Sequence, residues 1–177
     1  MKRQSLIFGL LVSTAVGAFA DEQKPAAPAA PAAPASPAAP QPPAPGSALH
    51  KEIVGVIPGV MQYDKKEFTV KAGVKVAVLF TNKGCPLQHN WILVKPGTDA
   101  AYGKAADDMI IKDPAGALKS LYQPESPDVL AKTSKLVGIG QSDIIEFTAP
   151  AEPGDYPYVC TFPGHRFLMK GVMHVTK

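Results

Sequence analysis

Three side chains that can bind a metal lie within ten residues near the C-terminal end of the chain. They are the thiol of Cys160, the imidazole of His165 and the thioether of Met169, spaced Cys-x4-His-x3-Met around the turn Pro163-Gly164. A turn of this length can fold three side chains onto one point. One soft sulfur, two imidazoles and a long, weak thioether contact form the trigonal site that favours copper and supports electron transfer. The segment therefore predicts a ligand loop for a single copper ion.

The second imidazole must come from elsewhere in the chain. Of the other three histidines, His50 falls in a region expected to be linker, and His174 lies close to the C-terminus. His89 instead precedes a short apolar run in the sequence His89-Asn90-Trp91. Taken alone, a histidine is more often structural than metal-binding, and a buried cysteine or methionine is usually part of the core. The ordered set is more specific than its members, and it makes His89 the expected partner of Cys160 and His165.

The elements that position these residues are short apolar runs broken by Gly, Pro and Asp. Between Val74 and Thr81 every second residue is apolar, which predicts a half-buried strand with Val74, Val76, Val78 and Phe80 on one side. We expect further strands at 53–57, 67–71, 91–94, 144–147, 156–160 and 172–175. Short strands separated by turns are typical of an all-β sandwich or barrel.

The stretch from Thr98 to Leu130 differs from its surroundings. Its alanines and Met109 favour a helix, whereas Asp113-Pro114 and the prolines at 124 and 127 prevent a long one. We expect an insertion over about 98–130 that carries one or two short helices.

The first twenty residues have the pattern of an export signal. Lys2 and Arg3 form a positive start, an apolar stretch follows, and Ala18-Phe19-Ala20 is a small-x-small cleavage site. The alternative is a retained membrane anchor, but the apolar stretch is shorter than the roughly 20 residues that a membrane span needs. We expect a signal peptide over 1–20, no transmembrane segment in the mature chain, and an exported, periplasmic protein. No cysteine follows Ala20 at once, so we expect no N-terminal lipid anchor.

Residues 21–48 are expected to be a linker. Within them, the stretch from Pro25 to Pro45 contains nine prolines and ten alanines, which cannot build a core. It is either a semi-rigid tether that lets the domain reach a partner or a segment without a task. One domain over 49–177 remains, a size that folds alone.

The charge balance of the mature chain does not indicate a particular class of partner. Without Lys2 and Arg3 the chain carries 16 basic and 15 acidic side chains. Nucleic acids and anionic membranes attract clearly basic proteins. We expect neither as a partner.

These motifs resemble the azurin and auracyanin branch of the blue copper proteins. The similarity runs from about Val60 to Val175, and it rests on Met61-Gln62-Tyr63, Phe68-Thr69-Val70, His89-Asn90-Trp91, Gly154-x-Tyr-x-Tyr-x-Cys160, Thr161-Phe-Pro-Gly-His165 and Met169-Lys-Gly. The resemblance implies a cupredoxin Greek-key β-sandwich, and a non-enzymatic carrier that moves single electrons between transient redox partners as copper cycles between Cu(II) and Cu(I).

The resemblance also implies roles for individual residues. His89, Cys160 and His165 would be equatorial ligands and Met169 the axial one. The Gln88 carbonyl would be a possible weak contact, where azurins usually have Gly. The residues expected around the ligands are Asn90, which ties the two ligand loops together, Thr161 and Phe162. The electron would leave through His165, inside an apolar patch for partners made of Leu87, Phe162, Pro163, Phe167 and Met61.

Cys85 departs from the family pattern, because azurins form a disulfide between two cysteines that this chain lacks. An exported protein with two cysteines would ordinarily join them. A Cys85–Cys160 disulfide, however, would forbid copper binding, and Cys85 acting as a ligand would leave a spare histidine or methionine. We expect Cys85 to remain a free thiol.

Two other function classes require features that differ from those of an electron carrier. Copper oxidases and nitrite reductases need additional histidine ligands, often in His-x-His pairs, and His50 and His174 are the only spare histidines. A copper storage or delivery protein needs exposed Met-rich or His-rich strings, which the sequence lacks. An intense blue colour with Cu(II) would support the carrier, and a colourless Cu(I) complex would support copper handling.

Overall fold

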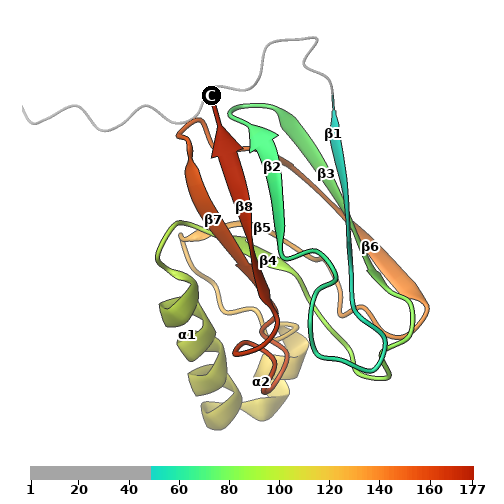
Figure 1. Ribbon diagram of the computed structural model, residues 1–177. Coiled ribbons are helices and arrows are strands. Elements are labelled where there is room, and N and C mark those ends of the chain that lie inside the picture. Colours follow the sequence, from blue (N-terminus) through green and yellow to red (C-terminus); the bar gives the residue numbers. More distant parts are fainter. Residues whose placement is uncertain (1–48) are drawn as a thin grey trace, which may run out of the picture. The chain divides into compact units, whose positions relative to one another are not determined.

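Two β-sheets pack face to face in the computed structural model, which describes residues 49–177 (Figure 1). The predicted signal peptide and the Ala/Pro-rich segment lie outside the described residues. The smaller sheet has the strand order β1-β3-β6 and the larger one the order β2-β8-β7-β4-β5. The strands are β1 His50–Gly55, β2 Glu67–Lys71, β3 Lys75–Asn82, β4 Ile92–Val94, β5 Val129–Lys132, β6 Gln141–Thr148, β7 Gly154–Val159 and β8 Lys170–Thr176.

The sheets combine parallel and antiparallel pairs. β1 runs parallel to β3, and β2 runs parallel to β8. The pairs β3–β6, β7–β8, β4–β7 and β4–β5 are antiparallel. The chain passes between the two sheets several times: β2 belongs to the larger sheet although it lies between β1 and β3 of the smaller one, and β6 belongs to the smaller sheet although it lies between β5 and β7 of the larger one. This arrangement is the expected β-sandwich.

The core lies between the two sheets and follows from the alternation of apolar residues. On β3, the side chains of Val76, Val78 and Phe80 are fully buried. They share the core with Trp91, which directly precedes β4, and with Tyr158 of β7, whose rings lie 5.3 Å apart and are also fully buried. Burying an aliphatic or aromatic side chain of this size contributes about 1.5–3 kcal/mol. The sandwich is therefore a firm support for the loops at its ends.

The helical insertion is confirmed, with one helix longer than expected. Helix α1 spans Asp99–Lys112 and helix α2 spans Pro114–Lys119. Asp113 separates them because its carboxylate accepts a hydrogen bond from the backbone of Gly116 and caps α2, with Pro114 at the first helical position. Tyr102 anchors α1 in a small cluster with Ile92, Val94 and Val159 of the larger sheet.

Two sequence-based expectations were wrong. His50 is the first residue of β1 rather than part of a linker. Strand β5 was not predicted, because its four residues are all half-buried at the edge of the larger sheet and show no alternation. The other expected strands are present, with ends that differ by up to three residues.

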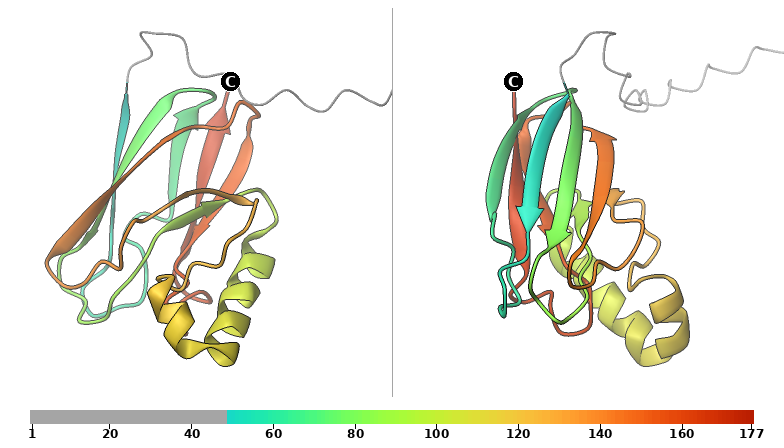
Figure 2. Two further views of the ribbon diagram at one scale, coloured as in Figure 1. Left: turned by 180° about the vertical axis from the view of Figure 1, so that it is seen from behind. Right: turned by 90° about the vertical axis from the view of Figure 1, so that its right-hand side faces the viewer.

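Both helices lie at the end of the sandwich where the loop between β7 and β8 turns, as the opposite views agree (Figures 1 and 2). The C-terminus lies at the other end. No described helix is long and apolar enough to cross a membrane.

Candidate metal centre

The loop between β7 and β8 holds three of the four predicted ligands in a fixed backbone. The amide of Cys160 donates to the carbonyl of Met169 at 3.0 Å, which closes the loop at its base. Inside it, the amide of His165 donates to Phe162 at 2.9 Å, and that of Met169 donates to His165 at 2.9 Å. Gly164 has φ +83°, a conformation that strains any residue with a side chain. The ligand positions are thus set by backbone hydrogen bonds.

The fourth predicted ligand, His89, comes from the connection between β3 and β4. Its backbone exchanges two hydrogen bonds with Val137, at 3.1 and 2.8 Å. The preceding loop is organised by Asn82, whose side-chain amide donates to the carbonyls of Cys85 and Leu87 at 3.0 and 2.9 Å and accepts from the Cys85 amide at 2.9 Å. His89 is therefore held by its pairing with Val137 and by the ordered loop that precedes it.

Asn90 lies between the two ligand segments. Its side-chain oxygen accepts from the backbone of Thr161 at 2.8 Å, and its side-chain nitrogen donates to the Thr161 hydroxyl at 3.0 Å. The hydroxyl of Tyr63 donates to the Asn90 carbonyl at 2.8 Å. These bonds cross-link the residue after His89 to the residue after Cys160, so the two segments cannot separate without breaking buried polar pairs.

His89, Cys160 and His165 converge on one point. One ligand atom from each lies within 4.8 Å of the others. The Cys160 Sγ is 3.6 Å from the Nδ1 of His165, and the rings of His89 and His165 are 4.8 Å apart. Within residues 49–177, neither ring nitrogen of His89 has a hydrogen-bond partner, although both are buried. Unpaired buried nitrogens are costly, so a thiol and two imidazoles arranged in this way fit a soft-to-intermediate metal such as copper.

Burial sets the protonation of the three donors. It lowers the pKa of His89 to about 4, with the nearby His165 as a smaller cause, and it lowers the pKa of His165 as well. Both imidazoles are therefore neutral at pH 7, the form that binds metals. Burial raises the pKa of Cys160 to about 12, against hydrogen bonds from the backbone of Asn90 and Phe162. The thiol must give up its proton when a metal binds, which couples binding to pH.

Met169 and Phe162 complete the surroundings of the three donors. Met169 is fully buried at the end of the loop. The ring of Phe162 lies between His165, at 4.8 Å, and Tyr122, at 5.3 Å. Gln88 is exposed. Only 2% of the surface of His165 is exposed, so solvent reaches this residue through a narrow opening.

The predicted partner patch is partly exposed. Leu87 is 43% and Phe167 is 63% exposed, and Pro163 is also exposed, whereas Met61 and Phe162 are half-buried. Leu168, which the sequence analysis did not include, is 56% exposed beside Phe167. The ligand loop thus presents the apolar side chains of Pro163, Phe167 and Leu168 to solvent.

Both cysteines are buried and neither is in a disulfide. Cys85 is 2% exposed and lies outside the group formed by His89, Cys160 and His165. The expectation that Cys85 is a free thiol agrees with this structure.

Sequence reasoning missed several residues that support the site. Tyr63 bonds to Asn90 from 27 positions away along the sequence. Val137 pairs with the backbone of His89, and Asn82 holds the loop that leads to His89 through Cys85 and Leu87. Asn82 ends an apolar strand and is followed by a turn, which is the one local signal that could have singled it out.

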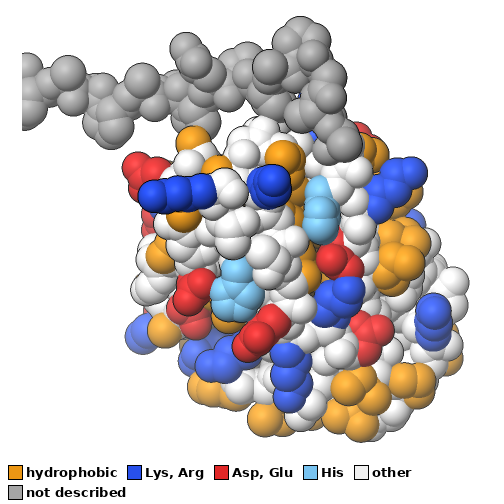
Figure 3. All heavy atoms as spheres, turned by 45° about the horizontal axis from the view of Figure 1, so that its top comes forward, with side chains coloured by type: hydrophobic (Ala, Val, Ile, Leu, Met, Phe, Trp, Pro, Cys, Tyr) orange, Lys and Arg blue, Asp and Glu red, His pale blue; other side chains and the backbone are white. Residues whose placement is uncertain are grey.

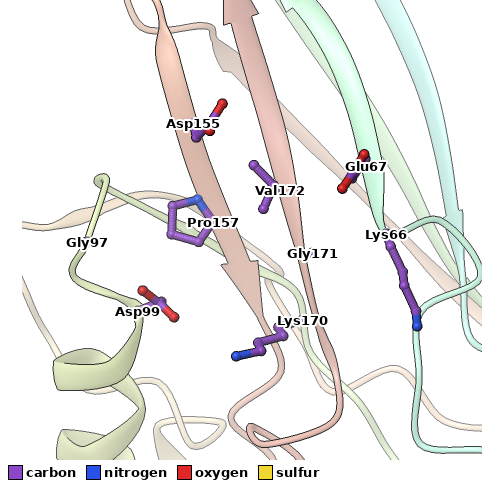
Figure 4. Close-up of a pocket in the computed structure, with 9 residues that line it drawn as sticks. All are labelled: Lys66, Glu67, Gly97, Asp99, Asp155, Pro157, Lys170, Gly171 and Val172. Atoms are coloured by element: carbon purple, nitrogen blue, oxygen red, sulfur yellow. The ribbon is translucent and has the colours of Figure 1, made fainter.

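A depression on the outer face of β7 and β8 is unrelated to this site (Figure 4). Lysines and carboxylates line it together, including Lys66, Lys170, Glu67 and Asp155. None of its nine lining residues is a predicted ligand.

The sequence and structure are similar to known copper proteins. The family model of copper binding proteins, plastocyanin/azurin family, matches residues 51–176. Auracyanin-A of Chloroflexus aurantiacus is 38% identical over 115 residues, which are 65% of this chain and 67% of that protein. Auracyanin-B of the same organism is 37% identical over 125 residues, 70% of this chain, and the match spans about half of its length, 51%.

A solved structure shows the same fold. The structure of auracyanin A, described as a "blue" copper protein of Chloroflexus aurantiacus, superposes with a TM-score of 0.63 at 35% identity and covers 73% of this chain and 100% of that one. The cupredoxin Greek-key sandwich is therefore confirmed. By sequence, fold and donor set together, this chain belongs to the plastocyanin/azurin family of copper-binding proteins, as a type 1 copper electron-transfer protein rather than an enzyme.

Proposed function

We propose that this chain is an exported carrier of single electrons that holds one copper ion with His89, Cys160, His165 and Met169. The observation that carries the proposal is the convergence of three buried donors within 4.8 Å, with both nitrogens of His89 unpaired among the described residues. Met169 is the axial donor in this proposal because it is fully buried on the same short loop. The Gln88 carbonyl is a possible weak contact.

Bound copper supplies the change between Cu(II) and Cu(I), and the chain supplies fixed positions for the donors. The hydrogen bonds of Cys160, His165 and Met169 within their loop resist movement of these residues. Asn90 joins that loop to the His89 segment. Because the donors are 0–2% exposed, water is kept from the site. Little movement on gaining or losing an electron means a low barrier to transfer.

The surface beside the ligand loop suits brief contacts with redox proteins. Leu87, Pro163 and Phe167 present a small apolar area there. Small interfaces are typical of transient electron-transfer complexes. Figure 3 brings forward the opposite end of the sandwich, where basic and acidic side chains are interspersed. That end therefore has no uniformly basic face of the kind that attracts nucleic acids or anionic membranes.

Burial also favours an electron carrier over a copper delivery protein. A protein that hands copper on needs ligands that a partner can reach, whereas His89, Cys160 and Met169 have no exposed surface. A buried site with pre-set donors holds its metal through many redox cycles.

Export to the periplasm is the proposed location. It is supported by the positive start, apolar stretch and Ala18-Phe19-Ala20 site of the first twenty residues. N-terminal sequencing of the protein recovered from a periplasmic fraction tests this, with Asp21 as the expected first residue. A chain that keeps Met1 would contradict it.

Rapid-mixing kinetics of the copper-loaded chain test electron transfer itself. The oxidised protein should be reduced, and the reduced protein reoxidised, in single second-order steps with small one-electron reagents, without loss of copper. Slow or irreversible reduction, or release of copper on reduction, would contradict a carrier and favour copper handling.

A further inference from the structure

The helical insertion contacts the ligand loop at a residue that binds no metal. Arg166 follows His165 directly, and its Nε donates to the Asp107 carboxylate of α1 at 2.5 Å. Both side chains are partly buried, 21% and 33% exposed. The Arg166 guanidinium also lies over the ring of Phe167, 4.0 Å from its centre. Arg166 therefore links the ligand loop to the helix.

The helix is shaped to receive this arginine. Gly103 lies one turn before Asp107 on the same face of α1. A Cβ at position 103 would lie 2.7 Å from the Cδ of Arg166, closer than real side chains approach. Glycine is unfavourable inside a helix, so its presence here is explained by the room that Arg166 needs.

A second contact comes from the residues after α2. The carbonyl of Leu121 accepts from the side chain of Asn90 at 2.9 Å, and the carbonyl of Tyr122 accepts from the hydroxyl of Thr161 at 2.6 Å. Leu121 and Tyr122 have φ of 60° and 59°, a left-handed conformation that costs free energy in residues with side chains. Both carbonyls thus reach the two side chains that join the ligand segments.

We propose that the helical insertion positions the copper ligand loop from outside, through the Asp107–Arg166 ion pair and the carbonyls of Leu121 and Tyr122. Arg166 and Asp107 are positioning residues in this proposal. Their effect on electron transfer rests on the proposed function, whereas their effect on the loop does not. The support is structural and is present before any metal binds, so the copper-free protein can test it.

Hydrogen exchange of the copper-free chain is the first test. Asp107→Asn and Arg166→Gln remove the ion pair, and Gly103→Ala displaces Arg166 while keeping every charge. In all three variants the amides of His165, Leu168 and Met169 should exchange about threefold faster, the size expected for loss of a partly exposed ion pair. The double variant of Asp107 and Arg166 should exchange no faster than either single variant.

Asp108→Asn is the matched control. Asp108 is the next residue of the same helix and pairs with Lys104, also on α1, at 2.7 Å. The same chemical change there should leave the ligand-loop amides at their original rates. Wild-type rates in the three test variants, or an equal increase in the control, would overturn the proposal.

Copper-loaded variants provide a readout that separates positioning from charge. By charge alone, Asp107→Asn should raise the reduction potential and Arg166→Gln should lower it. Loss of positioning should instead slow electron self-exchange by about threefold in both, and also in Gly103→Ala. Opposite potential shifts with unchanged self-exchange would overturn the proposal. If the wild-type protein takes up no copper, the proposed function is refuted but the positioning proposal is not. The hydrogen-exchange rates of the copper-free ligand loop would still test the positioning proposal.

Discussion

His89 and His165 at the ligand end of the sandwich differ from His174 on the outer face of the larger sheet in burial, in their polar neighbours and in the direction in which their pKa is shifted. His89 and His165 are buried, and burial lowers the pKa of both. His174 is about one-third exposed on β8, and its Nδ1 lies 2.7 Å from the Asp155 carboxylate on β7. Its Nε2 lies 3.8 Å from Glu67 on β2. The hydrogen bond to Asp155 is the main cause of its raised pKa.

The comparison shows that the surroundings of a histidine decide its role. A metal needs a neutral imidazole with a free nitrogen, which burial without a partner provides at His89. Two carboxylates favour the protonated form at His174, which offers no free electron pair. Four substitutions test this difference between the ligand end and the rest of the molecule, and they are given from the largest expected effect to the smallest.

Replacing Cys160 with serine should abolish the blue colour and nearly all redox activity. A hydroxyl is a poor ligand for copper, and no thiolate-to-copper charge transfer can occur without the sulfur. The fold should persist, because the loop is closed by backbone bonds. Absorption spectroscopy of the copper-treated variant checks this. A serine variant that stayed blue would move the thiolate assignment to Cys85.

Replacing Met169 with leucine should leave a folded, blue protein with a higher reduction potential. Leucine has a similar volume, so the cost to stability should stay below about 1.5 kcal/mol. Loss of a weak electron donor disfavours Cu(II) more than Cu(I). We expect a rise on the order of 60 mV, which is a tenfold change for one electron. Redox titration measures it, and an unchanged potential would mean that Met169 lies away from the metal.

Replacing His174 with glutamine should leave copper binding intact and slightly reduce stability in acid. The pKa of His174 is raised above its ordinary value of 6.5 in the folded state, so its stabilising effect is complete below that value and is lost as pH rises through the folded pKa. Because the pair is partly exposed, the difference should stay below about 1 kcal/mol. Denaturant unfolding at pH 5 and pH 9 checks it. A larger difference at pH 9 would contradict the sign.

Replacing Cys85 with alanine should change neither colour, copper stoichiometry nor potential. Three donors and Met169 are in place without it, and Cys85 and Cys160 are unpaired. A thiol count gives a second check, with two free thiols expected in the copper-free, non-reduced wild type. Zero thiols, together with copper uptake only after reduction, would instead make the two cysteines a disulfide that controls metal loading.

The sequence predicted the ligands more fully than their supports, for a physical reason. Cys160, His165 and Met169 are chemically unusual and close together, so their types and spacing carry the information. Leu121 and Tyr122 act through backbone carbonyls, which every residue has. Their partners Asn90 and Thr161 are 31 and 39 positions away, and no local pattern reveals such contacts.

The secondary structure likewise contains elements that the sequence pattern predicts and elements that it does not. β3 was predictable because one face is buried and the other is not, which produces alternation. β5 was not, because all four residues are half-buried. The Asp107–Arg166 pair also escaped prediction, since it joins positions 59 apart that are brought together by the docking of α1.

Titration of the copper-free wild-type chain with Cu(II), followed by absorption and electron paramagnetic resonance, tests the central claim most directly. The account predicts one tightly bound copper ion per chain, an intense blue band from the Cys160 thiolate, and the narrow hyperfine splitting of a type 1 centre. His174→Gln should give the same spectra. A pale complex with the broad splitting of tetragonal copper, or no uptake of copper at one equivalent, would contradict it.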